Sequence, residues 1–347
     1  MPPKVPGQLG IGVCSPALDE RGNSVRGVRA CESISRDLGL HFLQPPRAAV
    51  STVRARYTLA GVRSKRRRPP SQNHILDDEG HRVRVFELQG DLRFATLEPV
   101  LREVVAAGDA LQYVVLDFKR VSNADRTATR MLASLVDSCA ERGQQVVLTR
   151  ARRGELLAGF SGELHPKSAR TVSFQPQLDA GLEWCERGLL ERHGAPRIAS
   201  AIAVLAQHRL CEGASEGDIS LLESLVERRS YEPGSLIVRT GEPADAIYFL
   251  MAGEVSVIVE VSPGSARRLS TLSAGMGFGE AALIAGGLRS ADVRADTPVE
   301  CCLLAAETFT RLELARPSLM VRLLHNLLQS ATRTTRRLTR EVAALEG

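Results

Sequence analysis

The stretch "GFGEAALIAGGLRSA", residues 277–291, combines a glycine-rich turn, a glutamate, a short apolar segment and an arginine nine residues after the glutamate. Gly275, Gly277 and Gly279 permit positive φ angles and a close approach of other groups to the backbone. The segment "EAALIA" has the length of one or two helical turns, and the first amides of a helix attract an anion. This pattern predicts a turn and a short helix that interrupt a series of strands.

The segments around this stretch are short and apolar, and glycine or proline separates several of them. They are "SLIVR" (235–239), "AIYFLMAGEVSVIVEV" (246–261), "RRLSTL" (267–272), "ADVRA" (291–295) and "VECCLLA" (299–305). Many short strands at regular spacing predict a small antiparallel barrel or jelly roll. Helices are expected on both sides of it: "AIAVLAQH" (201–208) and "ISLLESLVERR" (219–229) before it, and a long helix over 317–345 that starts at a proline.

Glu280 and Arg289 are the charged residues of the opening stretch. The planar guanidinium of Arg289 offers a bidentate fork to a phosphate. Glu280 would be repelled by a phosphate, but its carboxylate can accept a hydrogen bond from a ribose hydroxyl. One phosphate met by one arginine beside one ribose hydroxyl predicts a cyclic nucleoside monophosphate as the ligand.

The sequences "FGEAALIAGGLRSA" and "GEPADAIYFLMAGEVSV" (241–257) resemble the phosphate-binding cassette and the barrel signature of cyclic nucleotide-binding domains. The resemblance implies that Glu280 binds the ribose 2′-hydroxyl, that Arg289 binds the cyclic phosphate, and that the helix at 317–345 acts as a lid. It also implies a wider set of ligand contacts: the amides of Gly279, Ala281 and Ala282 around the phosphate, and Ser290 on the phosphate or the base. We expect cAMP in preference to cGMP. The alternative is a degenerate site, or a surface Glu–Arg pair worth less than ~1 kcal/mol.

Residues 81–193 alternate between strand and helix patterns. Strands are predicted at 83–90, 113–118, 145–151 and 171–176, and helices at 97–108, 128–143 and 178–192. The run "YVVLDF" (113–118) is almost continuously apolar, as in a central strand that is covered on both faces. The alternation predicts a small α/β layer with a mostly parallel centre.

The stretch "VVLDFKRVSNADRTATRMLASL" (114–135) resembles the centre of a STAS domain, the fold of anti-sigma-factor antagonists and sulfate-transporter tails. Regulatory members of that family are phosphorylated on a Ser or Thr that follows an aspartate in this loop. Thr127 stands at the acceptor position, but Ala128 replaces the usual glycine and Arg126 separates Thr127 from Asp125. We therefore favour a second interpretation, in which Thr127 caps the next helix and the domain serves as a docking surface for a protein partner.

Residues 5–43 resemble the C-terminal end of serine-dependent glutaminases, which have a β-lactamase-like fold, and "SPALDERGNSVRG" (15–27) carries this match. Some bacterial glutaminases continue into a STAS domain and then a cyclic nucleotide-binding domain, so the resemblance spans nearly the whole chain. The expected fold is thus a STAS-like α/β sandwich followed by a β-roll, or jelly roll, flanked by helices. The expected domains are a glutaminase remnant at 1–45, an Arg/Pro-rich linker at 46–80, the STAS domain at 81–193 and the cyclic nucleotide-binding domain at 200–347.

The glutaminase family places its nucleophile in a Ser-x-x-Lys motif, where the lysine activates the serine. None of the four lysines of this chain, Lys4, Lys65, Lys119 and Lys167, has a serine three residues before it. We therefore expect no catalytic residues and no glutaminase activity. The alternative is a glutaminase, converting glutamine to glutamate and ammonia, of which this chain is a C-terminal fragment because the start at Met1 was assigned too late.

Charge is distributed unevenly: residues 1–80 contain 13 Lys and Arg against 7 Asp and Glu, and the rest of the chain is nearly neutral. The basic run "VRSKRRRPPS" (62–71) could bind nucleic acid or an anionic membrane. We favour a solvated linker, because the run contains mostly Arg and so matches the preference for Arg over Lys of the whole chain. Separately, aromatic residues make up only 4% of the chain, which argues against a stacking surface for nucleic acid.

The seven cysteines are scattered without a CxxC motif, and the seven histidines show no metal-ligand spacing, so no metal is expected. Scattered cysteines in apolar contexts suit a reducing cytosol, and no apolar run reaches the ~18 residues of a membrane span. The last predicted helix could pair with a second copy of the chain, or pack on the barrel, through apolar residues at helical spacing. These residues are Leu319, Leu323, Leu327 and Leu328.

Overall fold

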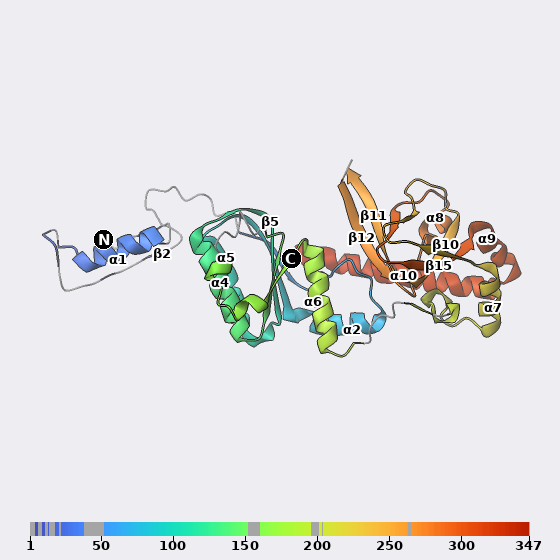
Figure 1. Ribbon diagram of the computed structural model, residues 1–347, viewed down its shortest axis with the longest axis horizontal. Helices are drawn as coiled ribbons and strands as arrows, with labels where there is room; N and C mark the ends of the chain where they lie inside the picture. Colours follow the sequence, from blue (N-terminus) through green and yellow to red (C-terminus); the bar gives the residue numbers. More distant parts are fainter. Residues whose placement is uncertain are drawn as a thin grey trace. The chain divides into compact units, whose positions relative to one another are not determined.

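The protein consists of two compact units of comparable size (Figure 1). A computed structural model describes residues 4–5, 9–10, 13, 18–20, 22–37, 52–151, 160–195, 201–202, 204–262 and 265–346. The first unit, here called the sheet unit, comprises Met1–Val62 and Glu79–Glu186. The second, the roll unit, comprises Arg63–Asp78 and Arg187–Gly347.

The sheet unit is built on five strands in the order β3-β4-β5-β6-β7. Strand β3 is antiparallel to β4, and β4 to β7 run parallel to one another. The strands are β3 (Val53–Thr58), β4 (Val83–Leu92), β5 (Tyr113–Ala124), β6 (Gln145–Thr149) and β7 (Val172–Gln175). The main helices are α3 (Phe94–Ala107), α4 (Arg126–Glu141) and the part of α6 (Leu178–Arg192) up to Glu186, with a short α5 (Phe160–Glu163). The predicted α/β layer with a parallel centre is confirmed.

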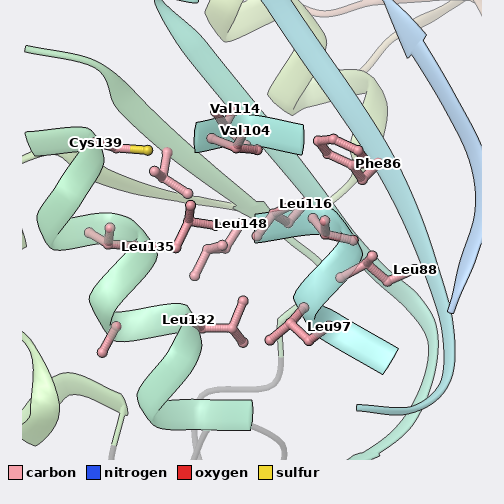
Figure 2. Packing of buried hydrophobic residues seen from close by; sticks show 14 of the residues in the cluster. Phe86, Leu88, Leu97, Val104, Val114, Leu116, Leu132, Leu135, Cys139 and Leu148 are labelled. Carbon is pink, nitrogen blue, oxygen red and sulfur yellow. The ribbon is translucent and has the colours of Figure 1, made fainter. Parts of the chain in front are cut away.

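One face of this sheet packs against α3 and α4 (Figure 2). Phe86 and Leu88 of β4 point to this face and are almost fully buried, because alternate residues of a strand share one side. Leu132 of α4 meets the same cluster from the helix side. The opposite face is covered by the start of α6, where Gly181 lies so close to Thr149 that a Cβ would stand 2.6 Å from its methyl group.

The N-terminal residues include a two-stranded ribbon, in which β1 (Lys4–Val5) pairs antiparallel with β2 (Leu9–Gly10), and a helix, α1 (Val25–Asp37). Residues 38–51, where the linker was expected to begin, lie outside the described residues.

The remainder of the expected linker is largely structured, which corrects the expectation of an Arg/Pro-rich linker over 46–80. Val53–Thr58 form strand β3 of the sheet, and Pro70–Glu79 form helix α2. Tyr57 is buried while Arg54 and Arg56 are exposed, so "VRARYT" is an alternating edge strand. The strand is not predicted from the sequence, because the arginines of this segment indicate a charged linker and not the exposed positions of a strand.

The roll unit contains two antiparallel four-stranded sheets, with the orders β13-β10-β15-β8 and β12-β11-β14-β9. The strands are β8 (Glu227–Tyr231), β9 (Leu236–Val238), β10 (Ala246–Ala252), β11 (Glu254–Ser262), β12 (Ser265–Ser273), β13 (Gly277–Phe278), β14 (Asp292–Ala295) and β15 (Val299–Ala305). The helices are α7 (Glu216–Leu225), α8 (Glu280–Ala285), α9 (Ala306–Ala315) and α10 (Pro317–Glu346). The predicted roll flanked by helices is confirmed.

The roll unit has two hydrophobic cores, and adjacent residues of β15 are buried in different ones. Cys301 lies in the cluster between the two sheets, whereas Cys302 lies in the cluster beneath α7, α9 and α10. Leu319, Leu323 and Leu327 of α10 are buried in the second cluster, but Leu328 is exposed. Three of the four leucines considered for pairing with a second copy therefore pack on the roll.

One helix prediction in this region is wrong, and a second helix ends earlier than predicted. The described residues of 201–208 contain no α-helix: the amide of Ile202 donates to the carbonyl of Met251 in β10, and residues 205–207 form a short 3-10 helix. Helix α7 ends at Leu225, and Glu227–Tyr231 pair with β15 as strand β8. In both places, strands of the roll provide backbone partners that local helical periodicity does not reveal.

Within the described ranges, no helix has the length and apolar character that crossing a membrane would require.

Candidate functional site

Residues 277–291 contain strand β13, at the edge of the sheet β13-β10-β15-β8, and the turn that follows this strand. Strand β13 pairs with β10, and the six-residue helix α8 follows at once. Gly279 joins them at φ = +86°, a conformation that suits glycine. A Cβ at this position would stand 2.8 Å from Nη1 of Arg289. The turn therefore requires glycine both for its backbone angle and for the close approach of Arg289.

Arg289 is buried at 4% exposure and is held by three protein acceptors. Its Nη1 donates to the carbonyl of Gly279 at 2.6 Å. Its Nη2 donates to Asp245 Oδ1 at 2.6 Å and to the carbonyl of Ala246 at 2.8 Å. These bonds use three of the five guanidinium N–H groups, which leaves the Nε hydrogen and one Nη1 hydrogen for a ligand.

The backbone of Arg289 is fixed as firmly as its side chain. Its amide donates to the carbonyl of Glu242 at 2.8 Å, and its carbonyl accepts from Gly241 at 2.9 Å. The "GEP" turn at 241–243 therefore aligns the arginine. A buried, immobilised guanidinium with spare donors is pre-organised for an anion.

An aromatic pair supports this guanidinium. Tyr248 stacks on Phe278 with ring centroids 4.8 Å apart, and the Cζ of Arg289 lies 5.7 Å from the Tyr248 ring centroid. Burial and, to a smaller extent, the Asp245 carboxylate together raise the pKa of Tyr248 to about 12. Tyr248 thus remains a neutral phenol that packs beside the cation.

Glu280 is the first residue of α8 and is partly exposed. Among the described residues, its side chain makes no hydrogen bond and no ion pair. Arg289 pairs with Asp245 instead, so the alternative of a surface Glu280–Arg289 pair is wrong. The carboxylate is therefore available to accept a hydroxyl hydrogen bond, as the proposed ribose contact requires.

The other predicted ligand contacts lie along the same turn. Ala282 is buried, whereas Ala281 and Ser290 are exposed. Their contacts with a nucleotide remain predictions, as do those of Gly279, Glu280 and Arg289. Asp245 and Tyr248 were not predicted to be site residues, although the "ADAIYF" segment places an acid directly before a buried strand.

In the sheet unit, the turn between strand β5 and helix α4 is capped by a side chain of the turn itself. Helix α4 begins at Arg126, and its N-cap is Asp125, whose Oδ1 accepts from the amide of Ala128 at 2.8 Å. The prediction that Thr127 caps this helix is therefore wrong, since the preceding aspartate fills that position. Ala128 is fully buried in the sheet unit's core. Thr127 is half-buried, and its role as a phosphate acceptor remains a prediction.

Comparison with protein families identifies three segments. Residues 3–43 match the family model described as Glutaminase, residues 75–154 match STAS domain, and residues 228–314 match Cyclic nucleotide-binding domain. The STAS match covers β4 to β6, and the third match covers most of the roll, including the whole cassette. A STAS domain and a cyclic nucleotide-binding domain are therefore present.

Among curated proteins, the chain is similar to Glutaminase 1 of Bradyrhizobium diazoefficiens, with 34% identity over 94% of this chain and 52% of that protein. A Glutaminase of Microcystis aeruginosa is 68% identical over 38 residues, 11% of each chain. The chain spans about half the length of the Bradyrhizobium glutaminases it matches. Among solved structures, the catabolite activator protein of Thermus thermophilus is 29% identical over 40% of this chain and 63% of that one, at a TM-score of 0.36. A likeness at that score supports no conclusion about this chain.

Proposed function

We propose that this chain is a regulatory protein that binds a cyclic nucleotide, cAMP in preference to cGMP, in its roll unit and engages a protein partner through its STAS domain. The observation that carries the proposal is the state of Arg289. This arginine is buried and immobilised, yet it retains two N–H donors beside a glutamate that has no partner among the described residues. An anion and a hydroxyl on one small ligand would satisfy both groups, as in a cyclic nucleotide.

The regulatory part of the proposal follows from the order of the domains. A ligand that binds one conformation of the roll better than another increases the population of the conformation that it binds better. Because one continuous chain carries the STAS domain and the roll, the STAS domain is the segment on which such a shift would act. Its partner would be a protein that docks on the STAS surface.

The proposal is tested by calorimetric titration of the full chain with cAMP and with cGMP. Arg289→Ala should weaken binding by about 2–4 kcal/mol, as expected when a charge-assisted contact is lost. Arg289→Lys should fall between the two, because a lysine keeps the charge but loses the fork. Arg294→Ala, at an exposed arginine of strand β14, is the matched control and should bind normally. Equal binding by the Arg289→Ala variant and the unaltered chain would remove the site assignment.

We also propose that this chain does not hydrolyse glutamine, although its first 40 residues match glutaminases. The support is the lack of a Ser-x-x-Lys motif around any of its lysines. Incubation of the full chain with glutamine should release no ammonia above background, with and without cAMP. Release of ammonia would favour the alternative, in which the chain is part of a glutaminase.

A further inference from the structure

The long C-terminal helix of the roll unit, α10, is drawn in red in Figure 1. Its first half packs on the roll through apolar side chains. Four of them are buried in the cluster beneath α7, α9 and α10: Leu319, Met320, Leu323 and Leu327. The roll therefore accounts for the apolar residues on this face of the helix.

Beyond Leu327, the partly buried face of α10 is mostly polar. Its residues continue the line of Leu323 and Leu327 at helical spacing, and they are Ser330, Thr334, Arg337, Glu341 and Ala344. From this face, Nη1 of Arg337 donates to the carbonyl of Ser64 at 3.3 Å. A surface helix ordinarily turns its apolar stripe toward the protein and its polar side chains toward water. The second half of α10 reverses that arrangement.

The exposed side of α10 carries apolar residues along its whole length. Six of them are between 36% and 67% exposed: Val321, Leu324, Leu328, Leu338, Val342 and Leu345. Ala331 and Thr335 are exposed on the same line. These eight residues, here called the outer seam, are separated alternately by three and four positions from 321 to 345.

This alternation places the outer seam at positions a and d of a heptad repeat. The seam extends for more than three heptads, a length at which the pattern indicates a coiled coil. An apolar face that packs on a globular core is broader than a strict a/d stripe. Here the residues that would widen the stripe on one side are polar: His325, Thr332 and Thr339. The outer seam is therefore as narrow as the contact between two helices.

The composition of the outer seam indicates how many helices would pair. With Val321 at position a, three of the four a residues are β-branched: Val321, Thr335 and Val342. Three of the four d residues are leucines: Leu324, Leu338 and Leu345. In parallel coiled coils, β-branched residues at a with leucine at d favour two strands.

The charges of α10 also permit two copies of the helix to meet. The helix has five arginines between residues 321 and 345: Arg322, Arg333, Arg336, Arg337 and Arg340. None of them falls at position a or d, or at the flanking positions e and g. Glu341 is the one charged residue at a flanking position in this range. Two identical seams would therefore meet without arginine facing arginine, a repulsion that would oppose the pairing of like surfaces.

We propose that the outer seam is a dimerisation surface and that it binds the α10 helix of a second copy of this chain, parallel and in register. The proposal goes beyond nucleotide binding, because neither Glu280 nor Arg289 takes part in it. An anionic membrane is the other occupant that an apolar stripe on an arginine-containing helix would suit. The narrow stripe favours a second copy, as does the lack of Phe, Trp and Tyr in α10, since such residues commonly anchor helices that lie on membranes.

The test is sedimentation velocity of the full chain over a range of micromolar concentrations. The unaltered chain should form a dimer as its concentration rises. Leu338→Asp and Val342→Asp should each raise the dimer dissociation constant about tenfold or more, because a carboxylate would be buried in the seam of each copy. Ala343→Asp is the matched control: it puts the same charge on the neighbouring exposed residue, off the seam, and should leave the dissociation constant within about twofold.

Oxidative cross-linking tests the parallel arrangement without burying a charge. In a parallel pair in register, position 342 of one copy lies beside position 342 of the other, within reach of a disulfide. In an antiparallel pair, the two positions lie toward opposite ends of the seam. Val342→Cys should therefore form more covalent dimer than the unaltered chain, and Ala343→Cys should not.

Several results would overturn the proposal. A monomer at every concentration would do so, and its sedimentation with anionic vesicles would assign the seam to a membrane surface. Dimers of Leu338→Asp and Val342→Asp as tight as that of the unaltered chain would place the interface elsewhere. Equal weakening by Ala343→Asp would show that the seam is not the contact, and cross-linking of Ala343→Cys but not Val342→Cys would exclude the register.

Thermal unfolding separates a dimer contact from a role in folding. At a concentration where the unaltered chain is monomeric, Leu338→Asp and Val342→Asp should melt at its temperature, because both side chains are about half exposed. A large fall in melting temperature under these conditions would show that the seam stabilises the monomer and would contradict the proposal.

Discussion

Two strand-to-helix turns, one in each unit, are built from similar parts and left in different states. In the sheet unit, Asp125 caps α4 and Ala128 is buried beneath it, so the turn satisfies its own polar groups. In the roll unit, α8 begins after a left-handed glycine without a side-chain cap. There, Glu280 has no partner within the described residues, and Arg289 retains two donors. The difference indicates that the turn at Asp125 is complete without a ligand, whereas the turn at 277–291 is arranged to bind one.

The largest effect is expected at Gly279. In Gly279→Ala, positive φ would disfavour the new Cβ, and that Cβ would collide with Arg289. We expect loss of nucleotide binding and a destabilisation of about 3 kcal/mol, measured by calorimetry and denaturant unfolding. Gly286→Ala is the control, because its φ is also positive but a Cβ there would meet nothing within 4 Å. It should cost about 1 kcal/mol and leave binding intact, and equal behaviour of the two variants would contradict the packing argument.

The second effect is a difference in pH response between the units. Burial lowers the pKa of His208 in the roll unit to about 4, whereas burial raises the pKa of Asp117 in the sheet unit. Since the unfolded chain takes up the histidine proton first, the roll should lose up to about 1.4 kcal/mol per pH unit as pH falls from about 6.5 to 4. The Asp117 contribution has the opposite sign: it is fully present below pH ~3.8 and is lost as pH rises through the raised pKa.

Hydrogen exchange measured from pH 4 to 7, corrected for the intrinsic rate, resolves the two responses. Peptides of β10 and β15 should report the acid loss, and peptides of β5 and β6 should not share it. His208→Gln should flatten the response of the roll, because glutamine keeps an acceptor for the Leu210 amide without the titration. An unchanged response in that variant would exclude His208 as its source.

The third effect tests the unpaired carboxylate of the cassette. Glu280→Gln should weaken nucleotide binding by about 1.5–3 kcal/mol, because an ionised acceptor of the ribose hydroxyl is lost. The folding stability should hardly change, since the carboxylate has no protein partner among the described residues. Calorimetry and thermal unfolding measure the two quantities separately. Loss of stability with normal affinity would show that Glu280 is a structural residue.

The smallest effect is expected from a change at the capped turn of the sheet unit, which should affect folding stability and leave binding unchanged. Asp125→Ala removes the N-cap of α4 and should destabilise the sheet unit by about 1 kcal/mol. Nucleotide affinity should remain the same. Thr127→Ala is the matched control and should cost less than Asp125→Ala, because Thr127 does not cap the helix. A larger loss at Thr127 than at Asp125 would reverse the comparison.

The sequence allowed most of both folds to be predicted, since long periodic segments dominate them. The run "YVVLDF" and the helix from Pro317 behave as their apolar spacing predicts. Predictions failed where tertiary partners decided the structure: Ile202 bonds to β10, and β8 forms only because β15 is available to pair with it. Strand β3 was missed because arginines fill its exposed positions.

Within the candidate site, the glycine turn and the position of Arg289 follow from the sequence. The partners of Arg289 do not, because Asp245 and the Ala246 carbonyl reach it only through the folding of the roll. Sequence spacing can suggest which groups act together along one turn, but it gives no information on groups that arrive from distant segments.

The central claim is that the cassette at 277–291 holds a cyclic nucleotide. Its most direct test is hydrogen exchange of the full chain at saturating cAMP, compared with the chain alone. The claim predicts slower exchange across 277–291, strongest at the amides of 279–282, and no such slowing in Arg289→Ala. Saturable binding of cAMP that left exchange in this stretch unchanged would contradict it.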